Sequence, residues 1–190
     1  MDRSQALAIL DEFIQNPNLK RHMLAVEASM RHYALHFGED ADLWGLTGLL
    51  HDFDWEIHPS MDSHPQKGAP LLRERGVPET IVRAILSHAD HTGVPRETLM
   101  EKVLYACDEL TGLIIATALV RPSRSLQDLK VKSVKKKWRD AHFAAAVDRD
   151  QIERGAADLG IDLWEHVEHV IQAMRPIEAL LGLGLENERP

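Results

Sequence analysis

The stretch LWGLTGLLHD, residues 43–52, joins a mostly apolar run to an adjacent charged pair, His51-Asp52. Burying such a pair is costly unless each group is hydrogen-bonded, paired or bound to a cation. Eight of the eleven histidines lie between positions 22 and 91, and Asp108 lies within a further apolar helix pattern. Imidazole nitrogens and carboxylate oxygens are ligands of first-row metals. This pattern predicts a metal site where several helices meet.

Two more polar residues border apolar helix stripes. His22 lies three residues after Leu19 and four before Val26, and Asp108 lies four residues after Leu104. A single histidine in such a place is also typical of a hydrogen-bonded core residue, and a single aspartate is typical of a salt bridge. Spacing alone leaves these readings open.

Helical periodicity runs through almost the whole chain, and no segment shows the alternation expected of a strand. We therefore predict an all-α domain of about eight or nine helices. The expected helix starts are Asp40 as an N-cap, Pro65 and Pro78 in first turns, and a start near Pro95; Asp148 with Gln151 and Asp162 with Glu165 are spaced like capping boxes. Gly38, Gly76 and Gly160 are expected to end or separate helices.

Composition favours one domain over residues 1–190, since the sequence contains no linker, repeat or low-complexity segment. The longest uncharged apolar run, 110–120, is shorter than the ~20 residues that span a bilayer. The start of the chain lacks the pattern of a signal peptide. The single cysteine, Cys107, excludes an intramolecular disulfide and favours a reducing, cytoplasmic setting. The net charge of −8 argues against general nucleic-acid binding.

The charge is unevenly distributed. Residues 121–139 contain eight Lys or Arg and one acid, Asp128, which is a net charge of 8 − 1 = +7 and leaves −15 for the rest. This basic segment is either a solvated helix face or a local site for an anion such as a substrate phosphate.

The ordered set His22, His51-Asp52, His64, His88 and Asp108 resembles the HD-domain (HDIG-type) family of metal-dependent phosphohydrolases. The segment 64–69, HPQKGA, is similar to the family's histidine-plus-glycine segment, and 85–88, ILSH, to its next histidine. The resemblance implies an HD-domain-like helical bundle. It covers residues 18–120, an HD-type metal-binding core, and leaves 121–190 as a C-terminal helical extension.

The resemblance implies a divalent metal cofactor (Mn, Fe, Co, Ni or Mg), one or two ions per chain. It implies four core ligands: His22, His51, Asp52 and Asp108. His64 and His88 match the additional ligands of members that hold a second ion or contact phosphate. Many of those members have adjacent histidines where this chain has His88-Ala89, and His91 could substitute only if the helix continues.

Several further residues are candidates for the reaction that the family performs. Asp52 would orient the nucleophilic water, and Asp54 or Glu56, directly after the pair, could protonate the leaving group. The candidates for phosphate contacts are Lys67, Arg121, Lys130 and Lys132. Trp55 could stack on a base, whereas Cys107 is expected to be an inert core thiol. The remaining histidines, His32, His36, His142, His166 and His169, are expected at the surface or at caps.

These observations favour a cytoplasmic phosphohydrolase, a phosphomonoesterase or phosphodiesterase, acting on a small phosphorylated metabolite or nucleotide. Two alternatives remain: a non-catalytic, metal-dependent nucleotide-binding or regulatory module, and a structural protein with a polar core. The extension 121–190 could cap the site through its basic segment or form a homodimer surface. We expect no membrane partner and no stable nucleic-acid binding.

Overall fold

The structure is a computed structural model, and it describes residues 1–184. Within this range the chain forms nine α-helices and two short 3₁₀ turns, with no strand, which confirms the all-α prediction. The elements are α1 (Arg3–Phe13), α2 (Pro17–Phe37), α3 (Ala41–Leu50), α4 (Gly68–Glu74), α5 (Glu79–Ser87), η1 (Asp90–Thr92), α6 (Leu99–Leu119), α7 (Val131–Trp138), α8 (Arg149–Asp158), α9 (Leu163–Met174) and η2 (Arg175–Ile177).

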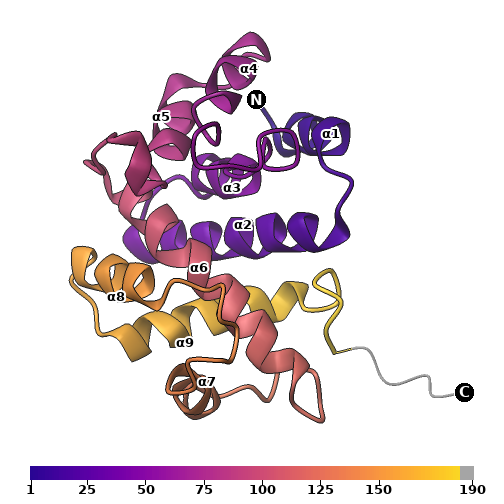
Figure 1. The fold of residues 1–190 in the computed structure, drawn as a ribbon, viewed down its shortest axis with the longest axis vertical. Helices are drawn as coiled ribbons and strands as arrows, with labels where there is room; N and C mark the ends of the chain where they lie inside the picture. Colours follow the sequence, from indigo (N-terminus) through magenta and orange to yellow (C-terminus); the bar gives the residue numbers. More distant parts are fainter. Residues whose placement is uncertain (185–190) are drawn as a thin grey trace, which may run out of the picture.

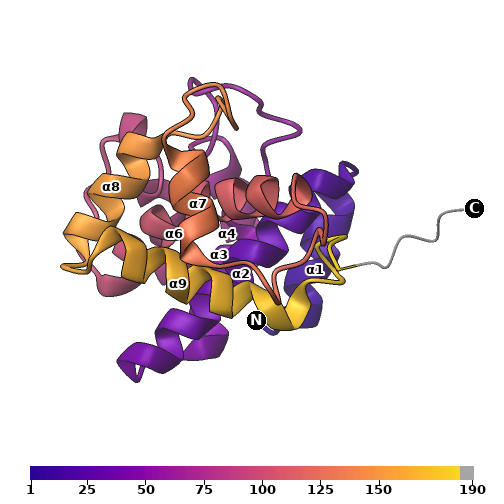
Figure 2. The same cartoon turned by 90° about the horizontal axis from the view of Figure 1, so that it is seen from below.

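The two longest helices, α2 and α6, cross at the centre of the molecule (Figure 1). Helices α1, α3, α4 and α5 lie on one side of α2, whereas α7, α8 and α9 lie on the other. Figure 2 shows this second group from below, packed over α2 and α6. The buried apolar side chains form two clusters accordingly, one centred on α3 and α5 and one on α6 and α9. The extension is therefore packed onto the HD-type core rather than projecting from it.

Close packing of α3 on α2 depends on a glycine in the apolar stretch. A Cβ at Gly48 would lie 2.9 Å from the carbonyl oxygen of Val26 and 2.9 Å from the Met30 side chain. The absent side chain lets the two helices approach closely. This approach places His51, which follows the last residue of α3, beside His22 of α2.

Helix α8 approaches α6 in a similar way. A Cβ at Gly155 would lie only 2.6 Å from the Cα of Ala106. The first turn of α8 consequently lies beside the segment of α6 that carries Asp108, and the backbone N–H of Asp148 donates to Glu109 at 3.2 Å. This contact brings the extension to the candidate site.

Several helix ends agree with the sequence prediction, and others do not. Asp40 caps α3 as expected. Asp148 and Asp162 cap α8 and α9 by accepting from backbone N–H groups. The helix expected near Pro95 begins instead at Leu99, because Thr98 and Glu101 form a capping box there. Pro65 was wrongly placed in a first helical turn: it precedes α4 and follows a cis peptide bond, whereas Pro78 is the residue just before α5.

No helix in residues 1–184 combines the length and the apolar character needed to cross a lipid bilayer. Cys107 is fully buried, and burial together with the nearby charge of Asp108 raises the pKa of its thiol, as expected for an unreactive core residue.

The prediction of surface positions was wrong for one histidine. His36 and His142 are exposed, and His32 and His169 are half-buried and contact each other. His166, however, is fully buried between α2 and α6. It accepts a hydrogen bond from the Tyr33 hydroxyl at 2.6 Å through Nδ1 and donates to the carbonyl of Ala106 at 2.8 Å through Nε2. His166 lies on the buried face of α9. A single histidine in a helical pattern does not indicate which face of the helix is buried.

We expect His166 to make folding stability dependent on pH. Burial lowers its pKa from 6.5 to about 4, so between these values the unfolded chain takes up a proton that the folded chain excludes. The stabilisation is complete above pH 6.5 and is lost as the pH falls toward 4, at about 1.4 kcal/mol per pH unit and about 3 kcal/mol in total. Urea unfolding across this range should show a flatter profile for His166→Gln than for the parent. The exposed control His142→Gln should keep the parental slope, and an unchanged slope in both variants would contradict the assignment.

Candidate metal centre

Four ligand atoms from three helical elements converge at one point. His22 projects from α2, His51 follows α3, and Asp108 projects from α6. The Nε2 atom of His22 lies 3.0 Å from Asp108 Oδ1 and 3.1 Å from His51 Nε2, and His51 Nε2 lies 3.4 Å from the same Oδ1. Asp52 Oδ2 completes the group, at 3.5 Å from His51 Nε2 and 3.7 Å from His22 Nε2. The structure thus brings together all four predicted core residues.

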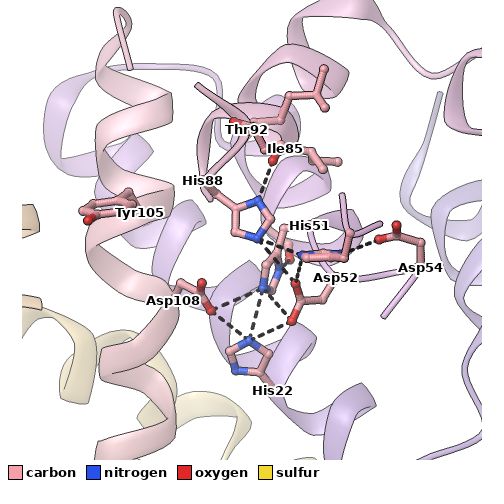
Figure 3. Close-up of polar contacts among 12 residues, drawn as sticks. His22, His51, Asp52, Asp54, Ile85, His88, Thr92, Tyr105 and Asp108 are labelled. Carbon is pink, nitrogen blue, oxygen red and sulfur yellow. Dashed lines mark hydrogen bonds and ion pairs between the residues drawn. The ribbon is translucent and has the colours of Figure 1, made fainter. Parts of the chain in front are cut away.

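The second carboxylate oxygen of Asp52 belongs to an adjoining group. Asp52 Oδ1 lies 3.2 Å from His64 Nε2 and 3.5 Å from His88 Nε2, and these two nitrogens are 3.3 Å apart. Figure 3 shows the side chains of His22, His51 and His88 reaching Asp52 from different sides, whereas Asp108 faces His22 and His51. The two oxygens of the Asp52 carboxylate therefore face two clusters of ligand atoms.

The four imidazoles are oriented by hydrogen bonds on their far sides. Nδ1 of His51 contacts the carbonyl oxygen of Gly48 at 2.8 Å, and Nδ1 of His88 contacts that of Ile85. Carbonyl oxygens only accept, so Nδ1 carries the proton in both rings and Nε2 presents a lone pair.

In the rings of His64 and His22, Nδ1 likewise carries the proton. Nδ1 of His64 donates to Asp54 Oδ1 at 2.7 Å. Nδ1 of His22 lies 3.2 Å from the hydroxyl oxygen of Thr111, and that hydroxyl donates its own proton to the Asp108 carbonyl. All four Nε2 lone pairs consequently point at the carboxylates.

This donor set fits divalent cations. Burial by itself would raise the pKa of Asp52 and of Asp108. In the metal-free chain, ring protons of the neighbouring histidines outweigh that effect and hold both pKa values below their usual range. A bound cation would take the place of these protons, and the Nε2 lone pairs would then face it. Two carboxylates and four imidazole lone pairs within hydrogen-bond distance of one another need a shared positive charge. Mixed nitrogen and oxygen ligands without cysteine suit Mn, Fe, Co, Ni or Mg rather than a structural zinc.

Asp54 supports the second group rather than facing a substrate. It is fully buried, its Oδ1 holds His64, and its Oδ2 has no hydrogen-bond partner in the described part of the chain. A Cβ at Gly68 would lie 2.5 Å from this carboxylate. The prediction of Asp54 as a proton donor is therefore corrected: its position explains the glycine of the 64–69 segment instead.

We expect Gly68→Ala to weaken metal binding. The added methyl group would displace the Asp54 carboxylate and release His64 from its orientation, and loss of such a supporting contact typically costs about 10–100-fold in metal affinity. Titration of metal-depleted protein with Mn²⁺, followed by calorimetry, measures the change. Gly112→Ala is the matched control, because a Cβ there meets only Val147, at 3.9 Å. Equal affinities in the two variants would contradict the role of Gly68.

Two further candidates lie outside the ligand groups. Glu56 accepts from the backbone N–H groups of Gln15 and Asn16 at 2.9 and 2.6 Å, so it fixes the loop between α1 and α2 and is not placed to donate a proton. His91 donates through Nε2 to the carbonyl of His64 at 2.7 Å. It does not join the second group, because α5 ends at Ser87 and the chain continues into η1.

A pocket of about 460 Å³ opens above the ligand groups. Its outer wall includes Trp55, Met61, Ala89, Asp90, His91, Glu109, Gly112, Ala146, Val147, Asp148 and Gln151. Burial and the charge of Asp108 raise the pKa of Glu109 to about 7. The sequence did not predict that residues 146–151 form part of the pocket wall, because no local signal indicates that α8 packs on α6. Trp55 is 38% exposed and meets the His64 ring edge-on.

The predicted phosphate-binding cations are absent from the lining of this pocket. Lys67 is exposed just before α4, and Arg121 is paired with Asp128 at 2.8 Å, about 20 Å along α6 from Asp108. Lys130 and Lys132 lie at the start of α7, on the far side of the extension. The extension does cap the site, but through 146–151 rather than through its basic segment.

Comparison with known families agrees with this geometry. The model of the HD domain matches residues 19–113, half of the chain. The chain belongs to the HD domain family. The match runs from α2 into α6 and contains every ligand described above, whereas the HD domain model does not extend over α7, α8 and α9. HD domain proteins bind divalent metals, and the two ligand groups of this HD domain could hold them.

Among curated proteins the HD domain is similar to ribonuclease Y of two bacteria. The sequence is 31% identical over 96 residues to that of Desulfotalea psychrophila and 30% identical over 96 residues to that of Lactobacillus acidophilus. Each match covers 50% of this chain but only 18% and 17% of the relatives, so the chain spans less than a fifth of their length. No solved structure matches.

Proposed function

We propose that this HD domain protein is a metal-dependent phosphohydrolase that binds two divalent ions and cleaves a phosphate ester of a small metabolite or nucleotide. The observation that carries the proposal is the bridging position of Asp52, whose two carboxylate oxygens each face a separate group of imidazole nitrogens. A divalent ion held in such a site lowers the pKa of its bound water and neutralises phosphate oxygens.

The residues of the chain have separate tasks in this proposal. His22, His51 and Asp108 hold one position, and His64 and His88 hold the other. Asp52 would contribute a carboxylate oxygen to each position and would orient the nucleophilic water. Thr111, Asp54 and two backbone carbonyls keep the imidazole lone pairs directed inward, so little reorganisation accompanies binding.

The similarity to ribonuclease Y supports cleavage of a phosphate ester as the reaction class. It does not extend to RNA as a substrate of this chain, since the match covers less than a fifth of those proteins. The pocket above the ligand groups, of about 460 Å³, suits a small molecule.

The test combines elemental analysis with a survey of phosphate esters. Protein purified without chelator should contain close to two equivalents of a divalent metal. With Mn²⁺, Co²⁺, Ni²⁺ or Mg²⁺ it should hydrolyse at least one small phosphate ester, releasing phosphate from a monoester or an alcohol and a monoester from a diester. Tight nucleotide binding without turnover would support the regulatory module instead. Metal-free protein without any activity would favour a structural role.

A further inference from the structure

The outer wall of the pocket carries no lysine or arginine in the described part of the chain. Apart from the metal ligands, the ionisable residues that line it are Asp90, His91, Glu109 and Asp148, and no Lys or Arg of residues 1–184 is among them. Whether or not Glu109 holds a proton, it adds no positive charge. A phosphate group bound here must therefore be held by cations at the ligand groups alone.

The nearby arginines are paired mainly with Asp90 and Tyr105. Arg96 contacts Asp90 at 2.8 Å and lies 3.6 Å above the Tyr105 ring, and it also donates to the carbonyl of Ser87. Arg154 donates to the Tyr105 hydroxyl at 3.1 Å and lies 3.5 Å from Asp90. These contacts neutralise Asp90 but leave Asp148 only a distant partner, Arg154 at 3.9 Å.

Asp148 holds a defined position on this wall. Its Oδ1 caps α8 by accepting from the backbone N–H of Gln151 at 3.0 Å, and its own N–H donates to Glu109. Trp55 and Val147 supply apolar surface on the same wall. The wall thus offers hydrogen-bond acceptors beside apolar contacts, and it opposes a second anionic group on the ligand.

We propose that the site selects a monophosphate whose organic part carries hydrogen-bond donors, hydroxyl or ammonium, and no further anionic group, and that Asp148 enforces this selection. This inference rests on the proposed phosphohydrolase function and narrows its substrate class. It excludes nucleoside diphosphates and triphosphates, phosphorylated carboxylic acids and RNA, in which additional anions would face the wall.

Glycerol 3-phosphate and 3-phosphoglycerate are the matched probes, because they differ by a hydroxymethyl group in place of a carboxylate. The holoprotein should hydrolyse glycerol 3-phosphate with a kcat/KM at least about tenfold higher than that for 3-phosphoglycerate. This ratio should fall as salt is raised from about 20 mM to about 500 mM, since salt screens the repulsion. Phosphoethanolamine separates the two donor chemistries: faster turnover than glycerol 3-phosphate identifies an ammonium ligand, and slower turnover a hydroxyl ligand.

Asp148→Asn tests the assigned residue. Asparagine caps a helix as well as aspartate does, so α8 should stay intact while the charge of Asp148 is removed. The ratio of kcat/KM for glycerol 3-phosphate to that for 3-phosphoglycerate should then fall at least about threefold. Asp158→Asn, exposed at the other end of α8, is the matched control and should keep the parental ratio. Phosphonate analogues of both probes, which are not hydrolysed, give the same comparison as dissociation constants by calorimetry.

The outcomes separate the two proposals. Equal or better turnover of 3-phosphoglycerate, or a ratio unchanged in Asp148→Asn, would overturn the selection and leave the phosphohydrolase intact. Selective binding of the phosphonates without hydrolysis of any ester would contradict the phosphohydrolase alone. If the holoprotein neither hydrolyses nor binds either compound, both proposals fail together.

Discussion

Asp52→Asn should lower the rate of phosphate-ester hydrolysis at least about a thousandfold, which corresponds to about 4 kcal/mol in the barrier. The side chain keeps its size but loses the charge that both ligand groups share. Asp52 Oδ1 and Oδ2 face nitrogens of four histidines at 3.2 to 3.7 Å, so the four lone pairs would then converge on a neutral amide. Metal content, measured by elemental analysis, should fall in the same variant.

The control for this change is Asp62→Asn. Asp62 is exposed in the loop between α3 and α4, away from the lining of the pocket. The Asp62→Asn variant should retain the activity and the metal content of the parent. Retention of activity by Asp52→Asn would remove the basis of the proposed site, whatever the behaviour of the control.

Removal of the metal should strongly destabilise the folded chain. Ligands come from α2, from α6, from the residues just after α3 and α5, and from the segment before α4, so bound ions connect parts of the fold that otherwise touch mainly through apolar side chains. A ligand present at about a thousand times its dissociation constant stabilises the native state by about 4 kcal/mol per site. For a chain of this size that is about 8–16 °C in the unfolding temperature.

Thermal unfolding with and without EDTA, followed by restoration with Mn²⁺, measures this effect. Asp52→Asn is the informative comparison, because EDTA should shift its unfolding temperature much less than that of the parent. Identical unfolding temperatures for the parent with and without EDTA would show that the ligand groups hold no ion under those conditions.

Local patterns marked the positions of the four core residues, and the family resemblance supplied their expected role as ligands. His22 and Asp108 border apolar helix stripes, and His51-Asp52 closes another, so burial of polar groups was expected at each position. Helix ends with strong local signals, such as Asp40 and Gly38, were predicted for the same reason. Thr98 was missed as the start of α6 because Pro95 presented a competing signal.

Other residues near the charged pair could not be assigned from their spacing. Asp54 and Glu56 both follow His51-Asp52 closely. Asp54 is buried and accepts from His64, whereas Glu56 accepts from the loop before α2. Their directions depend on Gly68 and on the backbone of Gln15, which contact them only in the folded chain. The lysines and arginine predicted to bind phosphate do not line the pocket for the same reason. The distribution of charge along the chain does not indicate which face of a helix lies at the site.

The sequence by itself determined the fold class and marked the polar residues that border the apolar helix stripes, because periodicity and residue type act over a few neighbouring positions. Only the tertiary structure decided that Asp52 bridges two groups, that His91 supports His64 instead of joining it, and that Asp148 and Glu109 form an acidic wall. The first and the last of these depend on close packing between helices, at Gly48 on α2 and at Gly155 on α6. Such packing is set by the shapes of both partners together, which neither segment encodes alone.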